Sequence, residues 1–196
     1  MDKKAIVIVD MLNDFVNEDG ALAVPGAKEI VENIGKIKGT AGEYGVMVVY
    51  ANDAHDPDDI EFKLWPKHAV KDTYSAMVIN ELAPGKKDNV FEKQDIPMFT
   101  NPDLNTLLQK NEIDELYITG VATEYCVRGA VLNGEDKFGD AVKGAIDIGY
   151  KVNVVVDAIA GVDVQKGDQY KALIEMGNAG AKPKYTAQVL EELVTC

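Results

Sequence analysis

Residues 5–10 read AIVIVD, an apolar run rich in β-branched side chains that ends at the carboxylate of Asp10. Apolar runs of the same kind occupy residues 46–50, 116–119 and 152–156, and weaker ones occupy residues 90–91 and 183–185. In the strong runs successive positions are apolar, without the alternation of a strand that faces water on one side. This pattern is typical of strands that are covered on both faces in a parallel sheet.

Helical patterns separate these runs. Residues 26–44 place apolar side chains on one helical stripe and end at two glycines: Ile30, Val31, Ile34 and Ile37, then Gly42 and Gly45. Asn101 is expected to cap a helix that begins at Pro102, and residues 166–176 and 186–194 are amphipathic. The alternation of strands and helices predicts an α/β fold with a doubly wound, mostly parallel central sheet and helices on both faces.

The composition narrows the classes of partner. The chain has 33 Asp and Glu against 20 Lys and Arg in 196 residues, a formal net charge of −13. At about 150 residues per domain, we expect one domain over residues 1–196. An acidic surface repels phosphate, so neither nucleic acid nor an anionic membrane is an expected partner. The apolar runs are far shorter than the ~20 residues of a membrane-spanning helix. The opening MDKKAIVIVD contains only five apolar residues before Asp10, which is too few for the core of a signal peptide. The two cysteines are far apart and do not form a disulfide framework. We therefore expect a cytoplasmic protein.

Reactive side chains follow the ends of four predicted strands. Asp10, the pair Asp53 and His55, Lys93, and Cys126 each come after a different apolar run. Because ligands of an open parallel sheet bind outside the carboxyl ends of its strands, these side chains are expected to meet at one edge. Each residue alone also fits an ordinary role, such as a turn residue, a solvated lysine or an inert buried thiol. Their convergence is what predicts a catalytic site.

Cys126 lies in the stretch GVATEYCV, residues 120–127. Thr123 is expected to cap the following helix, which would place Cys126 in the first helical turn. There the helix dipole favours the thiolate, and free backbone N–H groups can hold an oxyanion. A nearby lysine would lower the pKa of the thiol further, and an aspartate could take its proton. The alternative is a structural cysteine at the start of a helix; Cys196 is interpreted as an incidental thiol.

Both histidines of the chain lie in one predicted loop. Asp53 and His55 face the same side of an extended segment, and His68 follows 13 residues later. Two histidines and one aspartate with open coordination positions suit a catalytic divalent metal ion, most naturally zinc or iron. Glu61 is a candidate fourth ligand, either directly or through water. From the spacing alone, a metal site and a structural role are equally open.

Several other motifs do not occur in the sequence. It contains no G-x-G-x-x-G, no G-x-x-x-x-G-K-[ST], no H-E-x-x-H and no G-x-S-x-G. The acidic run of Asp53, Asp56, Asp58 and Asp59 lacks the glycine and the glutamate of a calcium-binding loop. It is therefore interpreted as a solvated face.

The order of these motifs resembles that of the isochorismatase-like cysteine hydrolases, and within them the nicotinamidases and pyrazinamidases. The similarity extends over nearly the whole chain and is carried by residues 5–10, Asn13-Asp14-Phe15, residues 20–26, Asp53 with His55, Trp65-Pro66 with His68, Lys93, residues 120–127, residues 156–159 and Glu175-Met176. The Asp/Lys/Cys combination is specific for the superfamily. The Asp-x-His pair and the Trp-Pro-x-His motif favour a nicotinamidase.

The resemblance implies a role for each matching residue. Asp10 would be the general base, Lys93 the cation that orients it and stabilises the thiolate, and Cys126 the nucleophile. The N–H groups of Ala122 and Cys126 would form the oxyanion hole, next to a cis peptide bond between Val121 and Ala122.

The resemblance also implies a metal site and a substrate pocket. Asp53, His55 and His68, with Glu61 as a further candidate, would hold a divalent metal ion: zinc, with iron or manganese as alternatives. Phe15 and Trp65 would flank an aromatic ring. The residues expected to contact the substrate are Phe15, Trp65, Val121, Ala122 and Tyr125.

The reaction implied in this way is the hydrolysis of nicotinamide to nicotinate and ammonia through a thioester, with the metal orienting the ring nitrogen. Three alternatives stay open: a hydrolase of another small amide or carbamoyl compound, an isochorismatase, and a catalytically silent binding protein of the same fold. Because the family usually self-associates, we expect a homodimer or homotetramer. The chain departs from the family by a longer stretch between Cys126 and Gly149, around residues 134–140, and by a short segment over residues 55–68.

Overall fold

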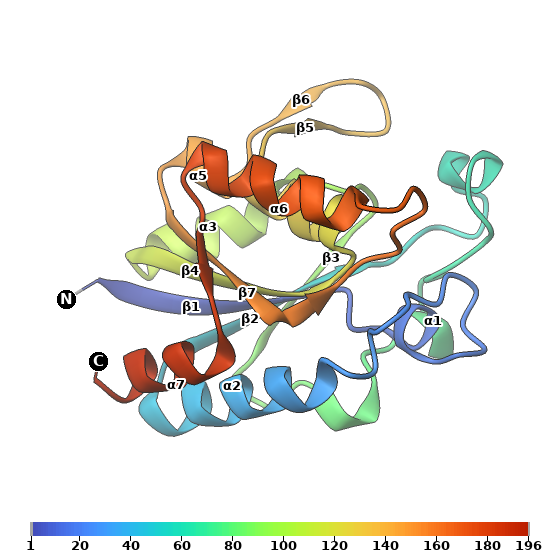
Figure 1. Cartoon of the computed structure of the whole chain (residues 1–196). Coiled ribbons are helices and arrows are strands. Elements are labelled where there is room, and N and C mark those ends of the chain that lie inside the picture. Colours follow the sequence, from blue (N-terminus) through green and yellow to red (C-terminus); the bar gives the residue numbers. More distant parts are fainter. Residues whose placement is uncertain (1, 196) are drawn as a thin grey trace.

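The computed structural model describes residues 2–195. Within them, six parallel strands form one sheet in the order β3-β2-β1-β4-β7-β8 (Figure 1). The strands are β1 (Lys3–Val9), β2 (Met47–Asp53), β3 (Asn89–Lys93), β4 (Ile113–Val121), β7 (Lys151–Ala160) and β8 (Lys182–Lys184). The predicted doubly wound α/β fold is confirmed.

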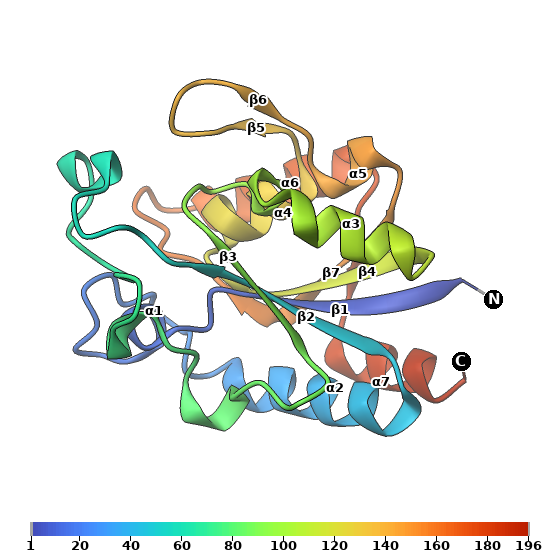
Figure 2. The same ribbon diagram turned by 180° about the vertical axis from the view of Figure 1, so that it is seen from behind.

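Helices cover both faces of this sheet. Figures 1 and 2 show α2 and α7 on one face, α3 to α6 on the other, and α1 beyond the carboxyl ends of the strands. The helices are α1 (Asn13–Val16), α2 (Val31–Tyr44), α3 (Pro102–Lys110), α4 (Arg128–Val131), α5 (Ala145–Ile148), α6 (Asp168–Ala179) and α7 (Thr186–Val194). Asn101 caps α3 as predicted, since its side chain accepts a hydrogen bond from the N–H of Asp103 at 3.0 Å. Across residues 2–195, no helix has the length and apolar character needed to cross a membrane.

The central strand β1 is buried on both faces. Ile6 and Ile8 pack into the core beneath α2 and α7, whereas Val7 and Val9 pack into the core on the side of α3. All four side chains are fully shielded from solvent. This double burial is the physical reason why the strand is an uninterrupted apolar run.

The strand order places one crevice at the middle of the sheet. From β1 the chain moves to one side to form β2 and β3, and it later returns to the other side of β1 to form β4. A crevice between the carboxyl ends of two strands whose connections diverge is the usual ligand site of a doubly wound sheet. Here those strands are β1, which leads to Asp10, and β4, which leads to the turn that carries Cys126.

Some element boundaries differ from the sequence prediction. Asp53 and Lys93 are the last residues of β2 and β3, not residues that follow them. The helix expected over residues 26–44 begins only at Val31. Gly26 has a left-handed φ of 78°, and turns occupy the residues between it and α2. Strand pairing therefore reaches further toward the site than the apolar runs indicated.

The connections after β2, β3 and β4 contain short elements in addition to the predicted strands and helices. Short helical turns follow β2, β3 and β4: η1 (Ile60–Lys63), η2 (Tyr74–Ala76), η3 (Asn80–Leu82), η4 (Met98–Thr100) and η5 (Thr123–Val127). The stretch around residues 134–140 forms an antiparallel hairpin of β5 (Gly134–Glu135) and β6 (Ala141–Val142). Figure 1 shows this hairpin projecting beyond α5 and α6.

Candidate active site

Asp10, Lys93 and Cys126 meet at the carboxyl end of the sheet. The ammonium of Lys93 donates hydrogen bonds to Asp10 Oδ2 at 2.9 Å and to Cys126 Sγ at 3.4 Å. The same ammonium also pairs with Asp53 Oδ1. All four residues are buried. The structure thus brings the three predicted residues into contact and adds Asp53 as a second carboxylate on Lys93.

Backbone contacts with β2 hold Asp10 in place. Its N–H donates to the carbonyl of Ala51 at 3.2 Å, and its Oδ1 accepts from the N–H of Asp53 at 2.6 Å. The φ of Asp10 is 52°, a left-handed conformation that is unfavourable for a residue other than glycine. The neighbouring strand therefore stabilises the strained backbone that directs this carboxylate toward Lys93.

A glycine lets β4 pass close to β1 just before the catalytic turn. Gly120 has a φ of 104°, and a Cβ atom at this position would lie 2.0 Å from the carbonyl oxygen of Val9. Only glycine fits such an approach. The next peptide bond, between Val121 and Ala122, is cis, as the family resemblance implied.

Cys126 lies within η5, a turn of π-helical geometry. The prediction that Thr123 caps this turn is wrong. Ala122 occupies the cap position with an extended backbone, and the buried hydroxyl of Thr123 has no hydrogen-bond partner within residues 2–195. The carbonyl of Ala122 accepts from the N–H groups of Tyr125 at 3.0 Å and Val127 at 3.1 Å. A backbone carbonyl, not a threonine side chain, therefore closes the turn.

Burial and two carboxylates set the protonation of this cluster. Burial and the charge of Asp53 raise the pKa of Asp10 to about 6, against the opposing effect of Lys93. Burial also raises the pKa of the Cys126 thiol well above its ordinary value; Lys93 opposes this shift, while Asp10 and Asp53 add to it. Burial would lower the pKa of Lys93, but the two carboxylates outweigh it and raise that pKa.

These shifts correct one expectation from the sequence. A favoured thiolate was expected from a helix start and a nearby lysine alone. Burial and the two carboxylates beside Lys93 outweigh that effect, so the pKa of the thiol is raised, not lowered. A base must therefore remove the thiol proton before or during attack.

A second group of side chains lies next to this cluster. Asp53, His55 and His68 each bring a ligand atom to within 4.8 Å of the others. His55 Nε2 lies 3.7 Å from Asp53 Oδ2 and is buried without a hydrogen-bond partner within residues 2–195. A buried nitrogen in that state is costly unless it binds an ion or water. Two imidazoles and a carboxylate suit a divalent transition-metal ion, so the residues present fit such a group.

A hydrogen bond at Nδ1 orients each of the two imidazole rings. His68 Nδ1 lies 2.7 Å from the carbonyl oxygen of Pro66, and His55 Nδ1 lies 3.1 Å from Asp59 Oδ2. Both partners only accept, so each Nδ1 carries the proton and each Nε2 is left for the metal group. Burial would lower the pKa of His55, but Asp53 and Asp59 outweigh it and raise that pKa to about 9. A metal ion therefore competes with a proton for Nε2 of His55.

Two acidic residues of the same loop, Asp59 and Glu61, lie beside the histidines. The interpretation of Asp59 as part of a solvated face is wrong, because the residue is buried and accepts from His55, from the N–H of Glu61 and from Lys137. The separation of four residues between His55 and Asp59, across a turn, is the sequence signal that could have found this pair. Glu61 lies near the metal group, with Oε1 3.9 Å from His68 Nε2. Its role as a fourth ligand stays a prediction.

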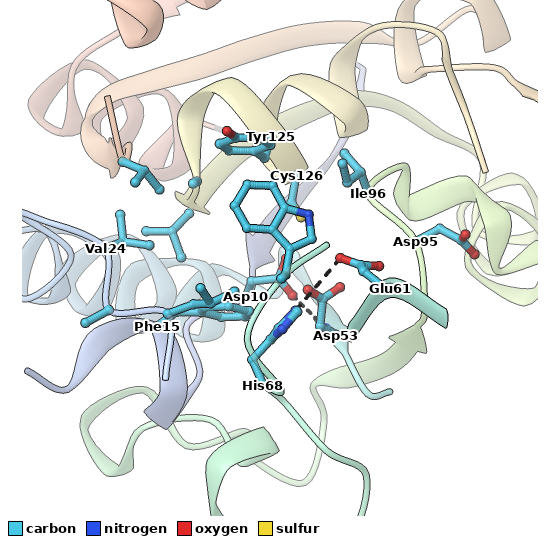
Figure 3. A pocket seen from close by; sticks show the side chains of 16 residues that line it. Asp10, Phe15, Val24, Asp53, Glu61, His68, Asp95, Ile96, Tyr125 and Cys126 are labelled. Carbon is cyan, nitrogen blue, oxygen red and sulfur yellow. Dashed lines mark hydrogen bonds and ion pairs between the residues drawn. The ribbon is translucent and has the colours of Figure 1, made fainter. Parts of the chain in front are cut away.

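A pocket of about 130 Å³ opens onto both clusters. Figure 3 shows Cys126 and Tyr125 on one side of it and Asp53, Glu61 and His68 on the other. All the residues predicted to contact a substrate line this pocket: Phe15, Trp65, Val121, Ala122 and Tyr125. The rings of Trp65 and Tyr125 meet edge to face, with centroids 5.6 Å apart. The wall therefore combines aromatic and aliphatic side chains with the carboxylates and the imidazole of the two clusters.

Part of the pocket wall was not predicted from the sequence. The additional lining residues come from the connections after β1, β3 and β7: Leu22, Ala23, Val24, Asp95, Ile96 and Val162. Leu22, Ala23 and Val24 lie in residues 20–26, which carry part of the family resemblance, but no chemical feature of the local sequence marks any of the six as a pocket residue. Among the described residues that line the pocket there is no lysine and no arginine.

The chain is similar to known proteins over most of its length. The isochorismatase domain matches residues 4–188. A nicotinamidase of Escherichia coli is 31% identical over 212 residues, which cover 92% of this chain and 94% of that protein. A pyrazinamidase of Pyrococcus horikoshii, solved in complex with zinc, has a TM-score of 0.80 and 29% identity, over 93% of this chain and 99% of its own. An N-carbamoylsarcosine amidase of Thermoplasma acidophilum has a TM-score of 0.78 and 32% identity, over 94% and 96%.

Proposed function

The chain belongs to the isochorismatase family, and from that membership we propose that it is an amidohydrolase that converts nicotinamide to nicotinate and ammonia. One observation carries the proposal. Asp10 and Cys126, which Lys93 links by its hydrogen bonds, line the same pocket as Asp53 and His68 of the metal group. Such a pocket offers the Cys126 nucleophile to the carboxamide of nicotinamide. On its opposite side it offers metal ligands to the pyridine ring.

In the first half of the reaction, Asp10 takes the proton of the Cys126 thiol and the sulfur attacks the carboxamide carbon. A pKa of about 6 makes Asp10 a stronger base than an ordinary aspartate while it is still ionised near neutral pH. Lys93 touches both groups and balances the negative charge that passes between them. The N–H groups of Ala122 and Cys126 are assigned to the oxyanion that forms on the carbonyl oxygen.

In the second half, the tetrahedral species collapses as Asp10 returns the proton to the departing nitrogen, which leaves as ammonia. The acyl group is then bound to Cys126 as a thioester. Asp10 next takes a proton from a water molecule, which attacks the thioester carbon, and the thiol leaves with that proton. One amide and one water are consumed, and one carboxylic acid and one ammonia are released.

The residues assigned to the metal ion are Asp53, His55 and His68, with Glu61 beside them. When bound, a divalent ion such as zinc supplies a Lewis-acid position for the lone pair of a pyridine nitrogen. Phe15 and Trp65 line the space between this group and Cys126 and confine a flat ring. In this assignment the histidine side orients the substrate, and the Cys126 side performs the chemistry.

A second candidate function is the hydrolysis of an N-carbamoyl amino acid, which the resemblance to the Thermoplasma acidophilum amidase suggests. Substrates of that class carry a carboxylate. The described residues that line the pocket include no lysine or arginine to pair with that carboxylate. Nicotinamide is uncharged, and this difference favours the first candidate.

To test the proposal, the purified protein is loaded with zinc and then incubated with nicotinamide in one reaction and with N-carbamoylsarcosine in another. We expect ammonia and nicotinate in equal amounts from nicotinamide, and a kcat/KM at least ~100-fold lower for the carbamoyl compound. Faster turnover of the carbamoyl compound would establish the second function, and no ammonia from either would exclude both.

A further inference from the structure

A lysine outside the pocket reaches the histidine side of the site from behind. Lys137 lies at the tip of the β5–β6 hairpin, and its Nζ donates to Asp59 Oδ2 at 2.8 Å. The same oxygen of Asp59 lies 3.1 Å from His55 Nδ1. Lys137, Asp59 and His55 therefore form one continuous line of polar contacts from the hairpin to the metal group.

The position of Lys137 is well defined by its surroundings. Its backbone N–H donates to Asp95 Oδ1 at 2.8 Å, and its Nζ also donates to Gln94 Oε1 at 2.9 Å. Its side chain is 18% exposed, against 1% for Asp59. Asp136 accepts two backbone N–H groups of the hairpin and closes its tip. In Figures 1 and 2 the hairpin leans toward the teal segment that contains η1, next to Asp59.

Lys137 completes the hydrogen bonding of a buried carboxylate. Asp59 Oδ1 accepts from the N–H of Glu61 at 3.0 Å, while Oδ2 is shared between Lys137 and His55. Without the ammonium, Oδ2 would keep only its contact with His55, and a buried carboxylate would lose its lysine counter-charge. The carboxylate would then be held in a less defined orientation, and so would the imidazole that depends on it.

We propose that Lys137 is a positioning residue for the metal group: it holds Asp59, Asp59 holds the His55 ring, and affinity for a divalent transition-metal ion depends on this line of contacts. The inference rests on the proposed function in one respect, the assignment of Asp53, His55 and His68 as ligands. The hairpin contains residues 134–140, one of the two stretches in which the sequence departs from the family resemblance.

The first test measures metal affinity without reference to catalysis. The full chain is stripped of metal and titrated with zinc in competition with a chromophoric chelator, and cobalt is bound in parallel for its absorption spectrum. We expect Lys137→Met to weaken zinc binding about tenfold and to change the cobalt spectrum, because outer-shell partners typically contribute 10- to 100-fold to metal affinity. Lys137→Arg should retain most of the affinity, since its side chain still donates to Asp59.

Lys143→Met is the matched control beside the same hairpin. Lys143 is exposed and directly follows β6, so the same substitution there should leave both zinc affinity and the cobalt spectrum unchanged. Zinc affinity of Lys137→Met within twofold of the wild type would overturn the inference. A wild-type chain that binds neither zinc nor cobalt would overturn it as well.

A double-mutant cycle tests the route through Asp59. Asp59→Asn should weaken zinc binding by about 10- to 100-fold, and Lys137→Met should add nothing further in the Asp59→Asn background. An equal loss from Lys137→Met in both backgrounds would show that Lys137 does not act through Asp59. That result would refute the inference even if the single variant had behaved as expected.

Turnover of nicotinamide is measured separately with saturating zinc. Weakened zinc binding in Lys137→Met, with no hydrolysis of nicotinamide by the wild type, would refute the proposed function and support the inference. Hydrolysis by the wild type, with equal zinc affinity in both proteins, would support the function and refute the inference. The two claims therefore fail in distinguishable ways.

Discussion

The two sides of the candidate site are built by different means. Asp10 follows β1, Lys93 ends β3, and Cys126 lies one turn beyond β4, so the backbones of paired strands place these groups. His55 and His68 lie in the long connection after β2 and depend on Asp59 and on a carbonyl for their orientation. One side is positioned by strand register, and the other by a series of polar contacts between loops.

This difference predicts different consequences of mutation. Loss of a side chain on the thiol side removes a reacting group or its only lysine, while the surrounding strands keep their register. Loss of a side chain on the histidine side changes how the metal ion and the substrate ring are held. It should therefore change the affinity for metal and substrate before it changes kcat.

The largest effect is expected for the nucleophile. Cys126→Ala should lower kcat for ammonia release by at least ~10⁴-fold, because the groups of a nucleophilic site act as a unit. The far-ultraviolet circular dichroism should not change, since a single buried sulfur is lost. Cys196→Ala is the control in the chain's other cysteine, which lies outside the described residues, and it should keep full activity. Iodoacetamide should inactivate the protein by labelling Cys126, and inactivation that tracks a label on Cys196 would refute the assignment.

The next largest effect is expected for the shared cation. Lys93→Met should lower kcat by about 10³-fold, since it removes the donor that stabilises charge on Asp10 and Cys126. It should also lower the free energy of unfolding by about 3–5 kcal/mol, because Asp10 and Asp53 then stay buried without their lysine. Urea denaturation checks the stability. The exposed pair of Lys151 with Asp2 supplies the control, and Lys151→Met should leave the urea midpoint unchanged.

A smaller effect is expected from pH. The pKa of Asp10 is raised to about 6 by burial and by Asp53, and the base must be ionised to accept the thiol proton. The logarithm of kcat/KM should therefore fall with a slope of about one per unit below pH 6 and be level above it. A profile that is level through pH 5 would assign the base to another group.

The same shift has a consequence for stability. The folded-state pKa of Asp10 lies above the unfolded value of about 3.9, so the protonated carboxyl favours the folded state. The stability that this group contributes is fully present below about pH 4 and is lost as pH rises through about 6. In the Asp10→Asn variant this part of the pH dependence of the urea midpoint should vanish.

The thiol side could be predicted from the sequence because its signals are local. An apolar run marks each strand, and parallel strands deliver the residues at their ends to one edge. Asp10, Lys93 and Cys126 were found in this way and lie in contact. The protonation of the thiol was not predictable, because it depends on burial and on Asp53, which the spacing placed only in the metal group.

The histidine side was predicted in part. The two histidines and Asp53 were found because the residue types are rare and suited to metals. Asp59 and Lys137 were missed, because they lie 78 positions apart in sequence and meet only through the folding of the hairpin onto the loop. The acidic run that contains Asp59 is typical of a solvated surface, and the sequence does not show that Lys137 of the hairpin packs against it. Side-chain contacts between loops leave no periodicity in the sequence, and so only the structure identifies them.

In the division of roles proposed for the site, the histidine side orients the substrate ring while the thiol side cleaves the amide. It is tested most directly by measuring kcat/KM for nicotinamide and for benzamide, which lacks the ring nitrogen, in the zinc-loaded wild type and in His68→Ala. We predict that the wild type prefers nicotinamide by at least ~100-fold and that the preference falls to near one in His68→Ala, because the contact that distinguishes the two rings is gone. The same preference in both proteins would contradict the account.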